Sequence, residues 1–193
     1  MAYIWCIIAA LRGDEGLMGT TQPGEKVTRF CAITFSAPAD MDRVLDDVKA
    51  RFGTAASSYG PVPFSAFTGY YAGEMGENLE KVYLTFAGLV DRDGLARAKL
   101  DTNEIEREYS ANGRRTVNLD PGYLARDKLV LATTKDFFHR LYLADGIYAE
   151  VTLHYRQGRF RYFSWTYADY KEPAFLAFLE KARARLVGEL RKK

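Results

Sequence analysis

A chain of 193 residues is long enough to form one well-packed domain, and no internal repeat or low-complexity linker divides it. Its 48% hydrophobic and 27% charged residues are ordinary for a soluble globular protein. The formal net charge of +2 favours no particular class of partner.

The first apolar run, AYIWCIIAAL at residues 2–11, predicts a buried strand. It is too short to cross a bilayer, and it lacks the basic leader and cleavage site of a secretion signal. Cys6 and Cys31 lie within apolar runs without CxxC spacing, so we expect two unpaired thiols and a cytoplasmic location.

The next elements follow from apolar spacing. Residues 12–26 predict a loop because they hold four Gly and one Pro. RFCAITFS (29–36), PVPFSAFTGYY (61–71) and KVYLTFAGLV (81–90) predict strands. A helix is expected between Asp40 and Gly53, because apolar residues recur there at helical spacing. These residues are Met41, Val44, Leu45, Val48 and Phe52.

The second half predicts a helix at DTNEIEREYSANG (101–113) and a strand at RTVNL (115–119). We expect Asp120-Pro121-Gly122 to terminate that strand, because Pro lacks a ladder donor and Gly permits positive φ. ARDKLVLATT (125–134) fits a short helix or a strand equally well. Two hairpins then precede a C-terminal helix at residues 172–193.

These elements predict an α+β fold. We expect a single domain over residues 1–193, with about seven strands in a largely antiparallel or mixed sheet and about three or four helices. Residues 1–28 form an expected N-terminal extension.

IYAEVTLHY (147–155) alternates between apolar and polar residues. Tyr148, Glu150, Thr152 and His154 are predicted on one face, and Ala149, Val151 and Leu153 on the buried face. A two-residue turn at Asp145-Gly146 would make His139 a diagonal neighbour of Glu150. A three-residue loop would place Arg140 opposite Glu150, and the Asp-Gly sequence favours this form slightly.

Cationic and hydroxyl side chains are dense between residues 114 and 148, and such groups suit phosphate oxygens. The predicted ligand-binding residues are Arg114, Arg115, Asn118, Lys128, Thr133, Thr134, Lys135, Arg140 and Tyr148. Asp120, Glu150 and His139 are the candidates for proton transfer, and the two acids could also hold a divalent cation. We expect Asp120, Lys135, His139 and Glu150 to meet in one pocket. The same residues are also consistent with a solvated ion pair worth about 1 kcal/mol or less.

Four motifs carry a family resemblance: TGYYAGEMG, NLDPGYL, KLVLATTKDFFHRLYLADGIYAEVTL and SWTYADY. Over residues 29–180 the chain resembles an uncharacterised bacterial domain family whose members are often labelled GTP-binding proteins. The resemblance implies a cytoplasmic protein and supplies no catalytic residue. This sequence departs from the family pattern at Ala168, where the pattern has Pro.

The sequence contains no GxxxxGK[ST] string, so a P-loop GTPase mechanism is not expected. With only His139 and His154, and no CxxC or HExxH, we expect no zinc site. No motif indicates a cofactor or a membrane segment. A protein-interaction domain is the first alternative. An RNA-binding protein is the second, because HYRQGRFRYFSW interleaves Arg with aromatic residues.

Overall fold

The computed structural model describes residues 21–36, 39–69, 72–111 and 114–192. The predicted first strand, residues 2–11, and Cys6 lie outside the described residues. Cys31 is a buried, unpaired thiol, as expected. Burial raises its pKa far above the ordinary value, so it stays protonated.

One antiparallel sheet organises the described chain, and its eight strands confirm the predicted α+β fold class. The strands follow the order β10-β9-β7-β6-β1-β3-β2, and β8 pairs with β9 outside this path. Their bounds are β1 Thr28–Phe35, β2 Ala55–Pro63, β3 Glu80–Phe86, β6 Val117–Leu124, β7 Lys128–Thr133, β8 Arg140–Ala144, β9 Ile147–Arg156 and β10 Arg159–Tyr162. A separate two-stranded sheet joins β4 Ser110–Ala111 and β5 Arg114–Arg115.

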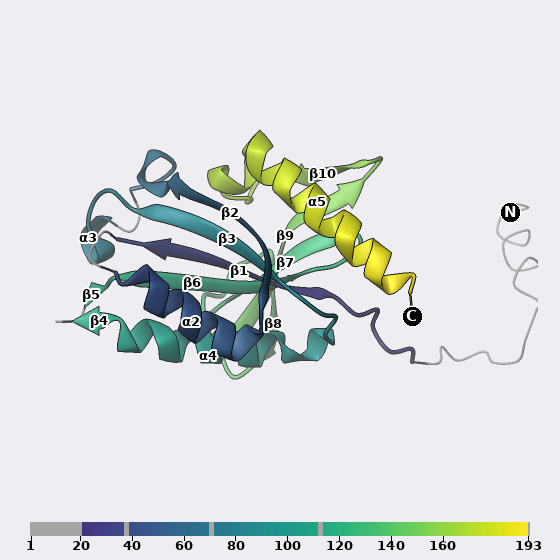
Figure 1. Ribbon diagram of the computed structural model, residues 1–193, viewed down its shortest axis with the longest axis horizontal. Coiled ribbons are helices and arrows are strands. Elements are labelled where there is room, and N and C mark those ends of the chain that lie inside the picture. Colours follow the sequence, from purple (N-terminus) through teal and green to yellow (C-terminus); the bar gives the residue numbers. More distant parts are fainter. Residues whose placement is uncertain (1–20, 37–38, 70–71, 112–113, 193) are drawn as a thin grey trace, which may run out of the picture.

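Helices cover both faces of the sheet (Figure 1). The helices are α2 Met41–Phe52, α3 Ala72–Met75, α4 Leu95–Glu108 and α5 Pro173–Leu190, with short 3-10 turns η1 Phe64–Ala66, η2 Arg92–Gly94 and η3 Ala168–Lys171. α2 and α4 share one core cluster with β1, β3 and β6, and α5 packs on the opposite face over a second cluster. The unit β1-α2-β2-β3-α4-β6, with strand order β6-β1-β3-β2, is a split βαβ arrangement.

Helix prediction was accurate where apolar spacing was strong. α2 spans the predicted residues, with Asp40 as its N-cap accepting a hydrogen bond from the Arg43 amide. The predicted C-terminal helix is α5, and five of its apolar residues at helical spacing are buried: Phe175, Phe178, Leu179, Ala182 and Leu186. α4 begins at Leu95, six residues before the predicted start, because its buried positions include the polar Lys99 and Thr102, which apolar spacing does not reveal. None of the helices in the described ranges has the length and apolar composition needed to cross a membrane.

Three strand predictions are corrected or settled. Residues 61–71 were predicted as a strand, but the strand lies earlier, at Ala55–Pro63, and is followed by η1. The sequence AASSYGPVP does not alternate between apolar and polar residues, so it gave no strand signal. Its side chains nevertheless alternate between half-buried and exposed over most of the strand. Residues 128–133 form a strand, which resolves the choice left open for residues 125–134.

The strand β6 runs straight through Asp120-Pro121-Gly122, so the predicted strand end there is wrong. β7 pairs with β6 only at Gly122–Leu124, and no described strand lies on that side of residues 117–121. Pro121 is tolerated because its nitrogen faces this unpaired edge, where no ladder bond is lost. At Gly122 a Cβ atom would lie 2.3 Å from the Val130 carbonyl oxygen, so the close approach of β7 requires glycine.

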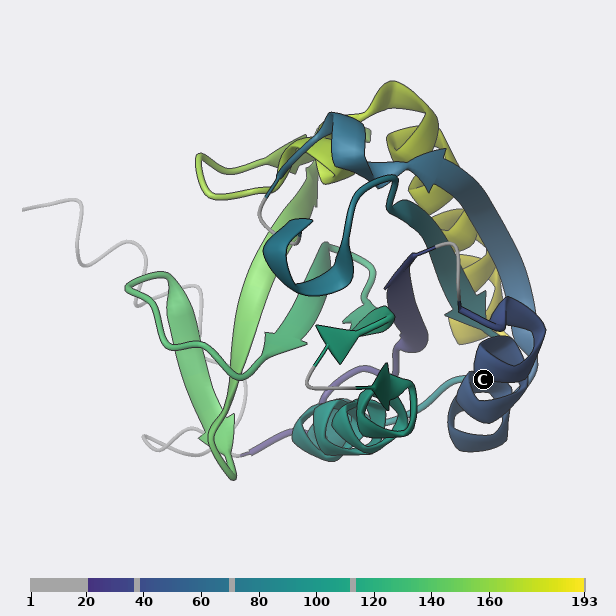
Figure 2. The same ribbon diagram turned by 90° about the vertical axis from the view of Figure 1, so that its left-hand side faces the viewer.

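The β8–β9 hairpin projects from the body of the molecule (Figure 2). Arg140 pairs with Glu150, as predicted, but through a different turn. Asp145 and Gly146 form a two-residue turn with both φ angles positive, and a bulge between Tyr142 and Ala144 shifts the register by one residue. The three-residue loop is therefore wrong although the pairing that it predicted is correct.

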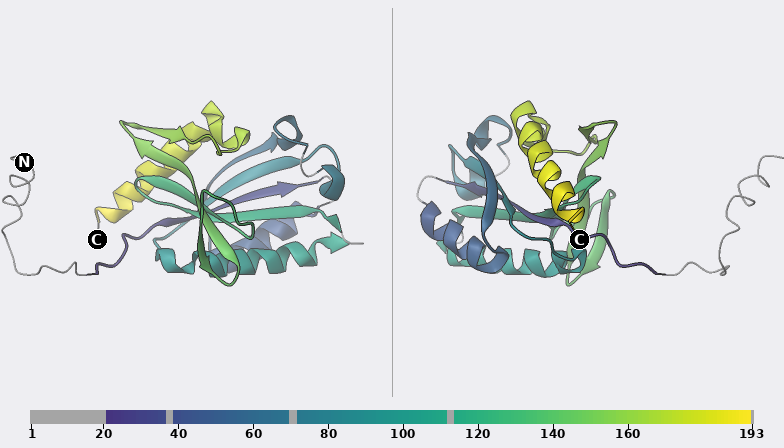
Figure 3. Two further views of the ribbon diagram at one scale, coloured as in Figure 1. Left: turned by 180° about the vertical axis from the view of Figure 1, so that it is seen from behind. Right: turned by 45° about the vertical axis from the view of Figure 1, so that its right-hand side comes forward.

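β9 is long enough to pair with β8 at one end and β10 at the other (Figure 3). A bulge opposite Leu129 and Val130 interrupts its alternation. Val151 packs with the cluster beneath α4, whereas Leu153 belongs to the cluster beneath α5. The predicted alternation therefore holds only as far as Val151, because sequence alternation does not reveal a bulge. The predicted burial is also corrected: Ala149 and Val151 are half-buried, whereas Glu150 and Thr152 are buried.

Candidate functional site

A cavity of about 570 Å³ lies on the α5 face of the sheet, next to the turn that leads into α5. Residues from five separate segments line it, including β3, β6, the β7–β8 connection and η3. The lining residues are Phe64, Thr68, Lys81, Asp120, Leu131, Lys135, Asp136, Phe137, His139, Arg140, Trp165, Tyr167, Asp169 and Tyr170. Three acids and three cations are among them, and five aromatic rings make up much of the rest.

Glu150 does not line this cavity itself but binds two residues that do. Its Oε2 accepts hydrogen bonds from His139 Nε2 at 3.0 Å and Arg140 Nε at 2.9 Å. All three side chains are less than 10% exposed. A carboxylate can only accept, so His139 carries its proton on Nε2 when neutral. The Arg140 guanidinium also donates from Nη1 to the Lys135 carbonyl oxygen, which leaves Nη2 outside both bonds.

His139 is fixed further by ring stacking. Its imidazole lies parallel to the Trp165 indole, with ring centroids 4.9 Å apart. The Trp165 Nε1 donates to the Val151 carbonyl oxygen, at the point of β9 between its β8 and β10 partners. The position of the imidazole is therefore set by the sheet itself.

A buried ion pair forms another part of the wall, and sequence analysis missed it. Lys81 Nζ lies 2.7 Å from Asp169 Oδ2, and both side chains are at most 4% exposed. The Tyr83 hydroxyl donates to the same oxygen at 2.7 Å. Burial and the Asp169 charge raise the pKa of Tyr83 far above its usual value, so the hydroxyl stays protonated. The only sequence signal was an acid within the SWTYADY motif and a lysine at the start of an apolar strand.

Among the described residues, two members of the cavity lining have a buried polar atom without a hydrogen-bond partner: His139 Nδ1 and the Tyr170 hydroxyl. Tyr170 is 1% exposed, and burial raises its pKa well above the usual value, so it remains a neutral hydroxyl. Unsatisfied buried groups are uncommon because each costs about 1–3 kcal/mol. Two at one cavity mark positions where a bound molecule could supply the missing bonds.

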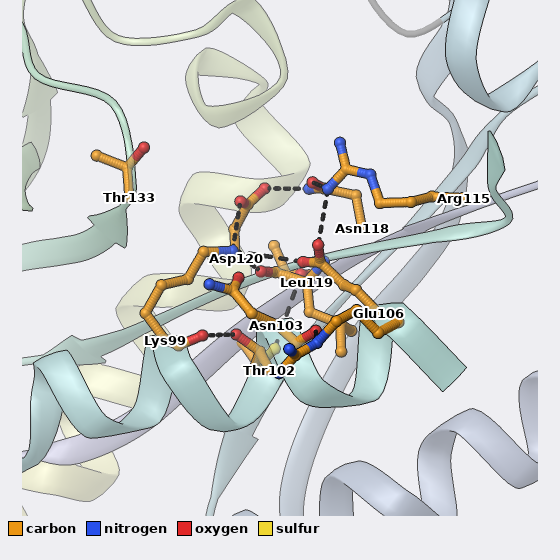
Figure 4. A network of polar contacts seen from close by, with 12 residues as sticks. Lys99, Thr102, Asn103, Glu106, Arg115, Asn118, Leu119, Asp120 and Thr133 are labelled. Atoms are coloured by element: carbon orange, nitrogen blue, oxygen red, sulfur yellow. Dashed lines mark hydrogen bonds and ion pairs between the residues drawn. The ribbon is translucent and has the colours of Figure 1, made fainter. Parts of the chain in front are cut away.

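Asp120 reaches the cavity from a polar network along the unpaired edge of β6 (Figure 4). Lys99 of α4 donates to the Leu119 carbonyl oxygen at 2.6 Å, and Glu106 accepts from the Leu119 amide at 2.8 Å. These two side chains supply the hydrogen bonds that a neighbouring strand would otherwise make. Asn118 Nδ2 donates to Asp120 Oδ2 at 2.9 Å, and Lys99 Nζ lies 4.0 Å from Asp120 Oδ1.

Arg115 closes the other end of this network. It binds both oxygens of Glu74 through Nε and Nη2, and Glu106 and Asn118 through Nη1. The bond from Arg115 lowers the pKa of Glu74, and Arg115 itself is held protonated. Arg115 and Asn118 thus position Asp120 and do not themselves line the cavity.

The structure places the predicted site residues in three groups. Asp120, Lys135, His139 and Arg140 line the cavity, with Glu150 directly behind two of them. Thr133 is half-buried, Thr134 is exposed, and neither lines the cavity. Of the remaining five, Arg115 and Asn118 belong to the network beside β6. The other three lie elsewhere: Arg114 on the exposed β5, Lys128 beside Asp127, and Tyr148 against Tyr142. Among the described residues, no three His, Cys, Asp or Glu side chains come together as metal ligands do.

A family model described as a domain of unknown function, DUF4416, matches residues 25–186. The chain belongs to this family. The DUF4416 match includes every residue that lines the cavity. The resemblance to an uncharacterised domain family is confirmed, while the family description names no ligand and gives the GTP-binding label no support. No protein of curated function and no solved structure gives a significant match.

Proposed function

We propose that the cavity binds a small molecule with an anionic group and a planar ring, as in a nucleotide. The observation that carries this proposal is the pair of buried orphan atoms, His139 Nδ1 and the Tyr170 hydroxyl, on one aromatic cavity. Its volume of about 570 Å³ lies within the range of small-molecule sites, roughly 300–1,000 Å³.

The cavity offers donors for an anionic group. Each buried acid is already bonded within the protein: Asp169 to Lys81 and Tyr83, and Glu150 to Arg140 and His139. Arg140 Nη2 and the Tyr170 hydroxyl remain outside these bonds and can donate to phosphate or carboxylate oxygens. Lys135 adds a positive charge at the same wall.

The aromatic side chains suit a planar group. Phe137 and Tyr167 line the cavity and are more than half exposed, so part of each ring is open to a ligand. A base or similar ring could stack on them, since such stacking contributes about 1–3 kcal/mol for nucleic-acid bases. His139 Nδ1 is an acceptor when the imidazole is neutral, so it suits an N–H or O–H of the same ligand.

Any chemistry in this cavity would fall to Asp120 and His139, with Glu150 orienting the imidazole. Of the three acids in the lining, Asp120 and Asp136 have no buried cation at hydrogen-bonding distance among the described residues, and Lys99 lies 4.0 Å from Asp120. This binding mode uses side chains on a sheet and needs no P-loop.

Isothermal titration calorimetry with ATP, GTP, AMP and GMP, with and without Mg²⁺, tests the proposal. We expect binding of at least one nucleotide, and about tenfold or greater loss in His139→Gln because a buried hydrogen-bonding position is removed. His154→Gln is the matched control, since His154 packs on Phe163 away from the cavity lining. No binding across the panel would reject a nucleotide-like ligand, and equal behaviour of the two variants would reject the cavity as the site.

A second function, protein interaction, is favoured by one observation. Phe138, Leu141 and Tyr142 on and beside β8 are 83%, 72% and 61% exposed, and β8 pairs with β9 alone among the described strands. Exposed edge strands with apolar side chains tend to pair with other chains. Light scattering of the wild type and Leu141→Lys tests this. We expect the mass of the wild type to rise with concentration and the mass of the variant to stay that of a monomer. A wild type that is monomeric at all concentrations would reject self-association through β8.

A further inference from the structure

A second, smaller cavity of about 160 Å³ lies on the opposite face of the sheet, between the start of β1, the end of α2 and the start of α4. Arginines from four elements line it: Arg29 of β1, Arg51 of α2, Arg92 of η2 and Arg97 of α4. Two acids, Asp91 and Asp101, also line it, so the charged lining carries an excess of two positive charges. The first cavity, by contrast, has equal numbers of acids and fixed cations in its lining.

Two of these arginines are neutralised and two are not. Arg97 lies 2.8 Å and Arg51 3.5 Å from Asp101, and both approach Glu104. Arg29 and Arg92 donate only to backbone carbonyl oxygens, of Phe52 and Glu25. Within the described part of the chain, neither has a carboxylate within ion-pairing distance.

The start of α4 adds a further positive contribution. Gly94 and Leu95 line the cavity, and the η2 turn leads directly into this helix of 14 residues. Neither Asp91 nor Gly94 provides a side-chain cap, and the first turn of α4 holds no acid. The Leu95 amide already donates to the Arg92 carbonyl oxygen, and Asp93 precedes the helix, so the contribution that favours an anion is the positive end of the helix dipole.

We propose that this cavity binds a phosphate group, held by Arg29 and Arg92 at the start of α4. Arg92 uses Nε for the Glu25 carbonyl oxygen and Arg29 uses Nη1 for that of Phe52, so each retains other N–H donors for phosphate oxygens. The volume admits a phosphate but falls below the roughly 300 Å³ of sites for larger ligands. Free phosphate and the phosphate of a monoester share this chemistry.

Calorimetric titration with inorganic phosphate at constant ionic strength, adjusted with NaCl, tests the proposal. We expect binding, and about tenfold weaker binding in Arg92→Gln and in Arg29→Gln, because charge-assisted hydrogen bonds are lost. Arg159→Gln, an exposed arginine on β10, should bind as the wild type does. Circular dichroism of each variant excludes misfolding as the cause.

Two further arms complete the experiment. Arg29 and Arg92 do not line the first cavity. Arg29→Gln and Arg92→Gln should therefore leave the binding of the nucleotide found in the panel unchanged, so failure here and failure of the nucleotide proposal are separable. Ribose 5-phosphate binding more tightly than phosphate would identify a monoester as the ligand, and the reverse would identify the free ion. Undetectable phosphate binding, or equal loss in Arg159→Gln and Arg92→Gln, would overturn the proposal.

Discussion

The polar groups beside β6 and the polar groups beside β9 both include buried charged side chains, but they differ in how completely they are bonded. Beside β6, Lys99 and Glu106 satisfy the Leu119 backbone, and Arg115 bonds two acids and an amide. Beside β9, Glu150 accepts three hydrogen bonds, yet its partner His139 retains an orphan Nδ1. The first cluster faces the helix α4, and the second lines a cavity.

This difference separates a structural cluster from a candidate binding cluster. The β6 cluster replaces a missing strand, because β7 does not pair with residues 117–121. A fully bonded network of that kind stabilises one arrangement of the core. The β9 cluster contains a residue of the cavity lining, His139, with a buried nitrogen that is unbonded within the described chain, and this unused hydrogen-bonding capacity motivates the binding proposal.

The largest expected effect is on the β6 cluster. Lys99→Met should lower the free energy of unfolding by about 3 kcal/mol, because it leaves the buried Leu119 carbonyl without its donor and removes one of the two cations that contact Glu106. Lys128→Met is the matched control and should cost about 1 kcal/mol or less, since its ion pair with Asp127 is partly exposed. Urea unfolding of both variants makes the measurement. Equal losses would show that the network does not stabilise the edge.

Glu150→Gln tests the β9 cluster, with a smaller effect on stability and a larger one on binding. We expect a loss of about 1–3 kcal/mol in the free energy of unfolding, because a neutral amide weakens the bonds to Arg140 and His139. Affinity for the nucleotide found in the panel should fall about tenfold. Glu180→Gln, on the exposed side of α5, is the control. A loss of about 3 kcal/mol with unchanged binding would make this cluster structural too.

Two tyrosine hydroxyls sharpen the comparison further. Tyr83→Phe should cost about 1–2 kcal/mol of stability, because its hydroxyl donates to buried Asp169. Tyr170→Phe should leave stability unchanged or raise it, since its hydroxyl has no partner, while weakening ligand binding. Thermal unfolding and calorimetric titration of both variants decide this. A destabilised Tyr170→Phe protein would mean that the hydroxyl is bonded in solution.

The smallest effect is expected at Glu74, which is 42% exposed. Its folded-state pKa is lowered from 4.5 by Arg115, so its stabilising contribution is present above about pH 4.5 and is lost as the pH falls through the folded-state pKa. Glu74→Gln should therefore cost under about 1 kcal/mol at pH 7, after allowance for solvent screening. Urea unfolding at pH 7 and pH 3 should show the difference from wild type at pH 7 alone. A difference that persists at pH 3 would assign it to packing.

The sequence by itself determined the elements whose apolar spacing is regular: α2, α5, β1, β3 and the β8–β9 hairpin. It also brought Asp120, Lys135, His139 and Arg140 forward as candidates, because polar side chains on short strands and turns stand out from an apolar core. These four line one cavity. Local spacing suffices for such features because side-chain direction alternates with a fixed period along a strand or helix.

Only the tertiary structure decided the rest. Pro121 lies within a strand because β7 does not pair with that part of β6. Leu153 changes face because of a bulge in β9. Neither feature leaves a local signal in the sequence. Lys81 and Asp169 are 88 residues apart in the sequence. Lys99 and Asp120 likewise lie on different elements, the helix α4 and the strand β6. A charged residue in a sequence normally predicts solvent exposure. Its burial becomes favourable only when the fold brings a specific partner next to it. The charged walls of the cavity could therefore not be derived from the sequence.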